Sequence, residues 1–201
     1  MLNIVNAQIL SKYPLQLTPT SGTAISHPNI RRDILLHGNY KFFEKVDFGL
    51  NGNKFAVAIG YNPSSASTNT ALDQTNRKLV NKFTALGYDG YYLLNLYPEI
   101  NSKKVNSGAV PFNKQFYEII GSSLFQYSTS YNASLDVYIF WGRSVPLSRK
   151  KIAALGTGLV NHNIYILINA TIGLHEHPSY LSITNIAFKT FSLPLTHKIR
   201  Q

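Results

Sequence analysis

Residues 55–61, Phe-Ala-Val-Ala-Ile-Gly-Tyr, carry no charged side chain and are followed at once by Asn62-Pro63. A short run that is apolar almost throughout is typical of a strand buried on both faces of a parallel sheet. Three later runs have the same character, at residues 91–96 (YYLLNL), 137–141 (VYIFW) and 164–168 (IYILI). These four segments predict the strands of a central sheet.

The spaces between the runs, roughly 25 to 45 residues each, are long enough for right-handed helical crossovers. Residues 73–86 predict a helix closed by Gly87, and residues 113–127 predict a second with apolar side chains at helical spacing. A third is expected over residues 148–155, ending at Gly156. We therefore expect an α/β fold: a three-layer α/β/α sandwich around a mainly parallel four-stranded sheet.

Ahead of the first core strand, residues 34–36 and 40–43 flank His37-Gly38-Asn39, which predicts a β-hairpin at the sheet edge. Residues 1–30 show no clear periodicity and are expected to form an N-terminal extension on the surface. No repeat, low-complexity tract or linker divides the rest. Residues 31–201 are thus expected to form a single domain.

The composition points to a polyanionic partner. Lys and Arg number 19 against 9 Asp and Glu, which leaves a formal charge of +10. Such a balance favours nucleic acid, although charge can also serve solubility alone. No apolar stretch is long enough to span a membrane and no signal-peptide pattern opens the chain, so we expect a soluble, cytoplasmic protein that binds no membrane. We expect DNA as its partner and a monomeric state.

The chain contains no cysteine, which excludes disulfides, thiolate zinc sites and iron–sulfur clusters. A metal would need histidine and carboxylate ligands, and these are scattered, so neither a metal nor another cofactor is expected. In an open parallel sheet, ligands bind beyond the carboxyl ends of the strands. The loops there are polar, and they begin at Tyr61, Asn95, Gly142 and His175.

The order of these loops resembles the uracil-DNA glycosylase superfamily. Asn62-Pro63 follows the first core strand, Asn95 ends the second, Phe140-Trp141-Gly142 ends the third and His177-Pro178-Ser179 lies in the last loop. The chain is also similar to an uncharacterised bacterial and phage family with NPSxA, DxT, WG and HPxYL motifs, here beginning at Asn62, Asp73, Trp141 and His177. The resemblance implies a DNA glycosylase that flips a base and hydrolyses its N-glycosidic bond, leaving an abasic site.

Such chemistry needs a positioned water and a donor to the departing base. The resemblance assigns the water to Asn62, the donor to His177 and the reading of the base edge to Asn95. An amide is a weak base, so Asp73 is the candidate to activate the water. Each residue also has a simpler interpretation: a turn before proline for Asn62, loop packing or a metal pair with His175 for His177, a strand-end cap for Asn95 and a helix N-cap for Asp73.

Further residues are expected to contact the nucleic acid. Tyr61 and Tyr97 flank the predicted pocket and are candidates to stack on a flipped base, and Ser64 is expected to contact the same base. Core packing is the alternative for either tyrosine ring. Tyr180 and Leu181 lie where relatives place a wedge that enters the duplex. Phosphate contacts are expected from Ser64, Ser65, Arg143, Arg149, Lys150, Lys151 and Ser179 unless the basic run is only a solvated helix face.

The loop at residues 64–67 has only small side chains, where uracil-selective relatives carry a bulky aromatic that rejects a 5-methyl group. This favours a larger base, such as a pyrimidine modified at its 5-position in phage DNA, and hence a role in antiviral defence or in phage DNA modification. The alternatives are a nucleic-acid-binding module of the same fold without chemistry and a hydrolase of free nucleosides or nucleotides. A metal-dependent nuclease is a third, which the lack of a carboxylate cluster disfavours.

Overall fold

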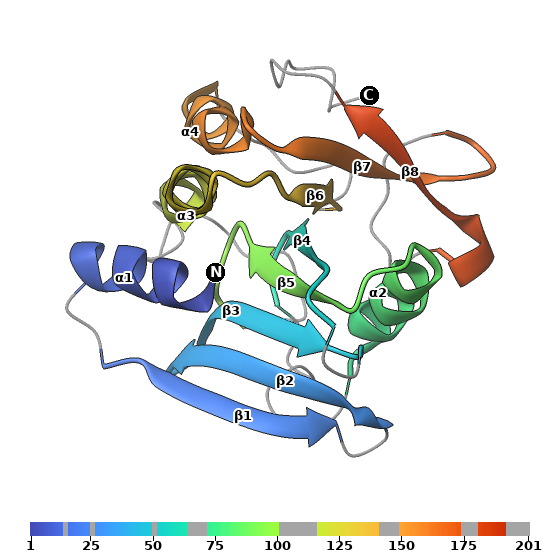
Figure 1. Ribbon diagram of the computed structural model, residues 1–201, viewed down its shortest axis with the longest axis horizontal. Coiled ribbons are helices and arrows are strands. Elements are labelled where there is room, and N and C mark those ends of the chain that lie inside the picture. The colour runs from blue at the N-terminus through green and yellow to red at the C-terminus, as the bar shows by residue number, and fades with distance from the viewer. Residues whose placement is uncertain are drawn as a thin grey trace.

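The computed structural model describes residues 1–13, 16–24, 27–49, 52–63, 72–100, 116–140, 149–173 and 181–191 (Figure 1). These contain helices and strands of a mixed α/β protein, so the expected α/β class is confirmed. In chain order they are α1 (Leu2–Lys12), β1 (Thr18–Ala24), β2 (His27–His37), β3 (Tyr40–Asp47), β4 (Phe55–Gly60), α2 (Gln74–Ala85), β5 (Gly90–Asn95), α3 (Phe116–Tyr131), β6 (Asp136–Ile139), α4 (Arg149–Leu159), β7 (Asn163–Asn169), the 3-10 helix η4 (Ile183–Asn185) and β8 (Ile186–Phe191).

The described strands form one sheet of eight in the order β1-β2-β3-β5-β4-β6-β7-β8. Neighbours β5-β4, β4-β6 and β6-β7 pair in parallel, whereas the other four pairs are antiparallel. The expected four-stranded, mainly parallel sheet is therefore only the parallel part of the described sheet, β5-β4-β6-β7. The prediction missed the edge strands β1 and β8 and treated the β2–β3 hairpin as an appendage. These antiparallel strands contain polar residues and lack the uniform apolar runs of buried parallel strands.

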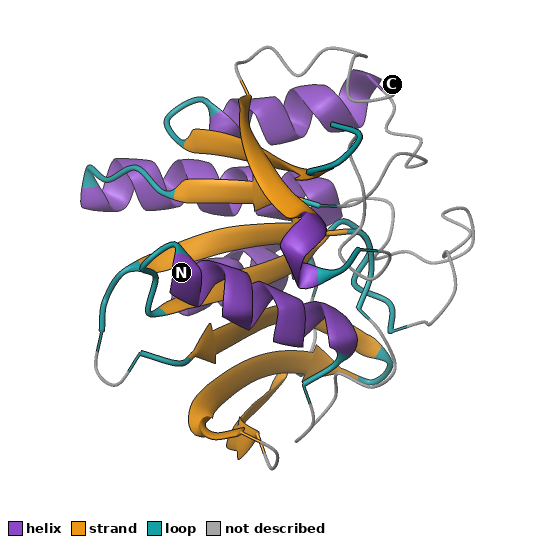
Figure 2. Cartoon of the chain, turned by 90° about the vertical axis from the view of Figure 1, so that its right-hand side faces the viewer, coloured by secondary structure: helices purple, strands orange, loops and turns teal. Residues whose placement is uncertain are grey.

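Helices cover both faces of the sheet (Figures 1 and 2). On one face, α1, α3 and α4 pack over a core cluster that includes Phe42, Ile59 and Leu94. On the other, α2 packs over a cluster that includes Phe83 and Tyr91. Successive residues of a strand point to opposite faces, so each buried strand contributes to both clusters.

The expectation that residues 1–30 form a surface extension is wrong. Helix α1 buries Val5 and Ile9 completely, and its Lys12 pairs with Glu118 of α3 at 2.8 Å. Strands β1 and β2 also begin within this range. The apolar residues of α1 include the exposed Leu10, so the sequence pattern does not single out its buried side, which carries Ile4, Val5 and Ile9.

Two of the predicted helices differ in their ends. The helix expected to start at residue 113 is described from Phe116 and continues to Tyr131, beyond the predicted residue 127. Helix α4 does not stop at Gly156 but runs to Leu159. A Cβ at Gly158 would lie 2.2 Å from the backbone oxygen of Gly121 in α3, so Gly158 permits close helix contact rather than ending the helix.

The other local predictions agree with the structure. Helix α2 begins after its N-cap Asp73, and Gly87 beyond its end has a φ of +75°. Strands β2 and β3 form the expected hairpin, with Gly38 at a φ of +51° in the turn. A positive φ is unfavourable for residues other than glycine. The glycines therefore predicted both the end of α2 and the turn of the hairpin from the sequence.

Two glycines of α4 provide a matched pair for testing this helix packing. A Cβ at Gly156 would meet no atom within 4 Å, so Gly156→Ala should stabilise the protein by about 0.5–1 kcal/mol through helix propensity. Gly158→Ala should destabilise it by about 1–3 kcal/mol or more, because α3 must move away. Urea unfolding of both variants measures this. Equal effects would contradict the close contact of the two helices.

His162 links three elements and makes stability depend on pH. Its Nδ1 accepts from Leu135 N at 3.0 Å, so its Nε2 carries the proton and donates to Leu124 O at 3.1 Å. Burial lowers the pKa of His162 below the usual 6.5, while the bond to Leu124 acts in the opposite direction.

A depressed pKa in a basic group means that the unfolded chain binds the proton more readily. The stabilisation is therefore complete above pH 6.5 and is lost as the pH falls from there through the folded-state pKa. We expect the free energy of unfolding to decrease over this acidic range in the wild type and to decrease less in His162→Gln. Urea titrations at several pH values measure the difference, and parallel curves would contradict it.

Candidate active site

The carboxyl end of β4 is the point at which the chain connections diverge. From β4 the chain passes through α2 on one face of the sheet to β5, and from β5 it passes through α3 on the other face to β6. Because β5 and β6 lie on opposite sides of β4, the two connections part above its end. Ligands of open α/β sheets bind at such switch points. Asn62 and Asn95 follow or end the strands at this edge.

Asn62 is half-buried two residues beyond β4. Its Nδ2 donates to Pro63 O at 3.4 Å, a long bond at the limit for this donor and acceptor. The structure thus places Asn62 at the predicted edge of the sheet. The simpler interpretation of this residue, a turn before Pro63, stays a prediction, because the chain from residue 64 lies outside the described residues.

Asn95 is the last residue of β5, and its side chain lies on the face covered by α2. Leu93 and Tyr91, two and four residues earlier, belong to the cluster on that face. A Cβ at Gly60 would lie 2.6 Å from Asn95 Oδ1 and 2.9 Å from Phe140 Cε2, which places the amide directly over Gly60. Asn95 is 4% exposed, so its amide is buried at this edge of the sheet.

The rings of Tyr61 and Tyr97 are not placed for stacking on a base. Both are buried, at 9% and 2% exposure, within the cluster on the α3 face, and their centroids are 4.9 Å apart in an edge-on contact. Burial raises the pKa of Tyr61, and the adjacent Tyr97 adds to the effect. Core packing, the alternative for these rings, therefore describes the structure better than the predicted stacking role.

Asp73 is the N-cap of α2. Its Oδ1 accepts from Asn76 N at 2.7 Å, as expected for an aspartate in this position. Helix α2 leads back to the start of β5 at the opposite edge, so Asp73 lies at the same edge of the sheet as Asn62. The capping interpretation is confirmed.

Sequence reasoning missed a buried charged cluster on the α2 face. Glu44 of β3 is fully buried and accepts from Arg32 Nε at 2.6 Å and from Lys41 Nζ at 2.5 Å. A β-bulge allows this: Leu35 pairs with Phe43 but Leu36 pairs with Lys41, so Phe42 is the extra residue. Phe42 and Phe43 consequently face the α3 side together. The signal in the sequence was the polar-apolar-apolar-polar order of residues 41–44, which breaks strict alternation.

Several predicted residues lie outside the described part of the structure: His177, Ser64, Ser65, Arg143, Ser179 and Tyr180. Arg149, Lys150 and Lys151 form the first turn of α4, but their side chains are outside it as well. Leu181 is described, and it is 6% exposed within the core cluster on the α2 face. The predicted wedge role of Leu181 is therefore incompatible with its packing.

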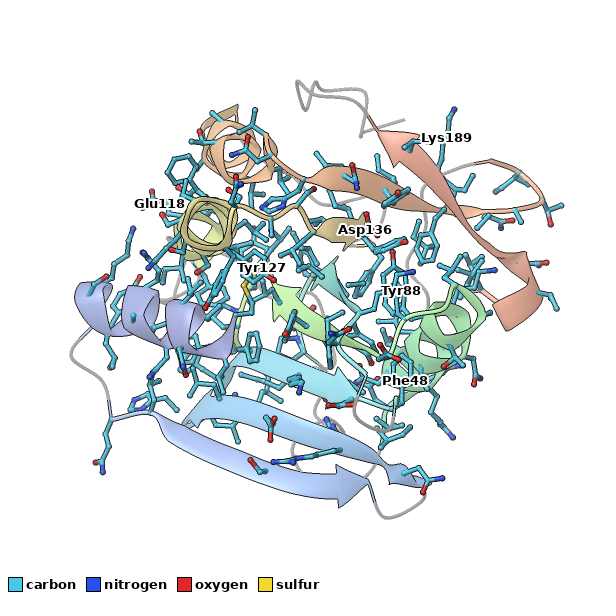
Figure 3. The ribbon with its side chains drawn as sticks, in the orientation of Figure 1. Phe48, Tyr88, Glu118, Tyr127, Asp136 and Lys189 are labelled. Carbon is cyan, nitrogen blue, oxygen red and sulfur yellow. The ribbon has the colours of Figure 1, made fainter. Side chains whose placement is uncertain are left out.

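A polar cleft of about 350 Å³ lies at the opposite edge of the sheet, where the parallel strands begin. Tyr88 and Asp136 on its wall point toward each other, and the hydroxyl donates to the carboxylate at 2.5 Å (Figure 3). Asn163 Nδ2 donates to the other oxygen of Asp136 at 2.8 Å. Both carboxylate oxygens thus have protein partners, which suits a structural role better than a reactive one.

Within the described ranges, no group of three or more His, Asp or Glu side chains could hold a metal ion. No helix in the same ranges has the length and apolar character needed to cross a bilayer. The candidate site of this α/β protein consequently consists of amides, one capping carboxylate and a buried charged cluster at the carboxyl edge of a mixed sheet.

Comparison with known proteins identifies a family. Residues 48–179 match the family described as "Protein of unknown function (DUF1643)", and the chain belongs to it. This match includes β4 to β7 and thus the switch point. No curated protein matches the sequence. Among solved structures, the acetyl xylan esterase from Paenibacillus sp. R4 has 12% identity and a TM-score of 0.36, and the alignment covers 80% of this chain and 56% of the esterase.

Gly60→Ala tests the geometry of the site directly. The new Cβ would overlap Asn95 Oδ1 and the Phe140 ring, so both side chains must shift. We expect a loss of about 1–3 kcal/mol in the free energy of unfolding and a change in the NMR chemical shifts of the Asn95 side-chain NH₂. Gly156→Ala is the control and should leave those resonances in place. Unchanged Asn95 resonances in Gly60→Ala would contradict the placement of the amide.

Proposed function

We propose that this protein is a DNA N-glycosylase that reads a flipped base with Asn95. The observation that carries the proposal is the buried Asn95 amide, which lies over Gly60 at the switch point. A site that hydrogen-bonds its ligand through a buried polar group discriminates strongly against ligands that lack the matching group. A nucleobase edge offers a donor and an acceptor side by side, as the amide itself does.

The parallel part of the sheet supports a glycosylase-type core. Its strands β5-β4-β6-β7 follow a doubly wound order, with α2 on one face and α3 and α4 on the other. We propose that this part corresponds to the uracil-DNA glycosylase sandwich, and that β1, β2, β3 and β8 extend it. The net charge of +10 suits a DNA backbone as partner.

In the proposed reaction, Asn62 Oδ1 accepts a hydrogen bond from a water molecule and orients it toward C1′ of the sugar. Asp73 takes a proton from that water as its oxygen bonds to C1′ and the bond from C1′ to the base nitrogen breaks. The electron pair leaves with the base, which His177 stabilises by donating to its oxygen, and the proton that Asp73 accepted passes through solvent to the departed base. The products are an abasic site and a free base, and no cofactor takes part.

A second candidate, a DNA-binding module of the same fold without catalysis, is favoured by one observation. The Asp73 carboxylate already caps Asn76 N, and an amide such as Asn62 is a weak base. In either case we propose that the protein acts as a monomer in the cytoplasm. We further propose that the base is a pyrimidine enlarged at its 5-position, as in phage DNA, in antiviral defence or in phage DNA modification.

Release of free bases tests the function. Duplexes that contain uracil, a mismatch or a 5-modified pyrimidine are incubated with the protein, and the released base is identified by mass spectrometry. Asn62→Ala and His177→Ala should each lower the rate by about 100-fold or more. Asn161→Ala, an exposed asparagine near the other edge of the sheet, is the matched control and should keep it.

If the wild type binds DNA but releases no base from any of these duplexes, the binding module replaces the glycosylase. Release of plain uracil at the same rate as the modified base would exclude the enlarged-base proposal and leave the glycosylase in place.

A further inference from the structure

Glu44 is a fully buried carboxylate with two buried cations, Arg32 and Lys41, each about 1% exposed. Removing such ions from water is expensive, and replacing a buried ion cluster with apolar side chains often leaves a protein equally stable or more stable. Stability alone is therefore a weak reason for this cluster. Its contacts lead away from the core of the sheet and toward the first turn of α2.

Asn76 connects the cluster to that turn. Asn76 is fully buried, its Nδ2 donates to Glu44 Oε1 at 3.5 Å, and its Oδ1 accepts from the Tyr91 hydroxyl at 2.7 Å. Its backbone N–H donates to Asp73 Oδ1 at 2.7 Å. A single residue thus joins Glu44 of β3 and Tyr91 of β5 to the capping carboxylate of α2.

The electrostatics around Tyr91 locate Asp73 close to the same cluster. Burial raises the pKa of the Tyr91 hydroxyl well above its usual value, and the negative charges of Glu44 and Asp73 raise it further, whereas Arg32 lowers it. Tyr91 consequently remains a neutral donor. Its hydroxyl lies within electrostatic reach of Glu44 and Asp73 together, which fits a continuous polar path from the sheet to the helix cap.

We propose that Glu44, Asn76 and Tyr91 are positioning residues that hold Asp73 at the carboxyl edge of the sheet. Arg32 and Lys41 fix Glu44, Glu44 and Tyr91 orient the Asn76 amide, and Asn76 N–H fixes one oxygen of Asp73. This inference rests on the proposed function, in which Asp73 activates the water.

Tyr91→Phe tests the proposal with little change of shape. It removes the hydroxyl that donates to Asn76 and leaves the ring in place. Tyr138→Phe is the matched control: Tyr138 is a buried strand tyrosine of the same core cluster, and its hydroxyl bonds to that of Tyr88 at 2.8 Å, away from α2's first turn. We expect kcat for base release to fall about tenfold in Tyr91→Phe, with KM unchanged, and to stay at the wild-type value in Tyr138→Phe.

A second measurement does not depend on activity. Amide hydrogen exchange at Asn76 N–H reports the bond to Asp73, and it should become about tenfold faster in Tyr91→Phe and in Asn76→Ala, where the amide link is also lost, but not in Tyr138→Phe. If exchange rises in this pattern while the wild type releases no base, the proposed reaction fails and the positioning of Asp73 stands. Unchanged exchange at Asn76, or equal changes in both tyrosine variants, would overturn the inference.

Discussion

The rest of the structure depends on the parallel pairing of β4 on both of its sides. Ala56, Val57, Ala58 and Ile59 are completely buried, because β5 and β6 flank the strand and helices cover both faces. Burying a valine or isoleucine side chain contributes about 1.5–3 kcal/mol. Because neighbouring strands and helices enclose β4, the polar residues that follow Gly60 can reach solvent only beyond the carboxyl end of the strand. The location of the candidate site follows from this constraint.

The antiparallel half of the sheet adds the polar groups behind that edge. Strands β2 and β3 extend the parallel core past β5, and the bulge at Phe42 turns Lys41 and Glu44 toward α2. Loss of one partner from a buried ion cluster of this kind costs about 3–5 kcal/mol, since a charge remains without its counter-charge. Arg32, Lys41 and Glu44 therefore depend on one another for stability, and the hairpin that carries them contacts the first turn of α2 through Glu44 and Asn76.

The candidate site combines a group suited to recognition with groups of modest reactivity. Asn95 presents a buried amide over Gly60, where a ligand with a donor and an acceptor would satisfy it. Asn62 can orient a water molecule but is a weak base, and Asp73 has one oxygen committed to its helix. In the proposed function, Asn95 recognises the base, and the position of Asp73 distinguishes an enzyme from a binding module.

The amino-acid sequence by itself determined the parallel strands, the cap and glycine stop of α2, the hairpin turn at Gly38 and the edge at which Asn62 and Asn95 lie. These features depend on local chemistry: apolar runs, a capping carboxylate and positive φ angles. Only the tertiary structure decided that α1 belongs to the core, that α4 continues through Gly156, that Tyr61 and Tyr97 face away from the site and that Glu44 is buried with Arg32 and Lys41. Each of these depends on a partner distant in the chain, and sequence periodicity does not identify that partner.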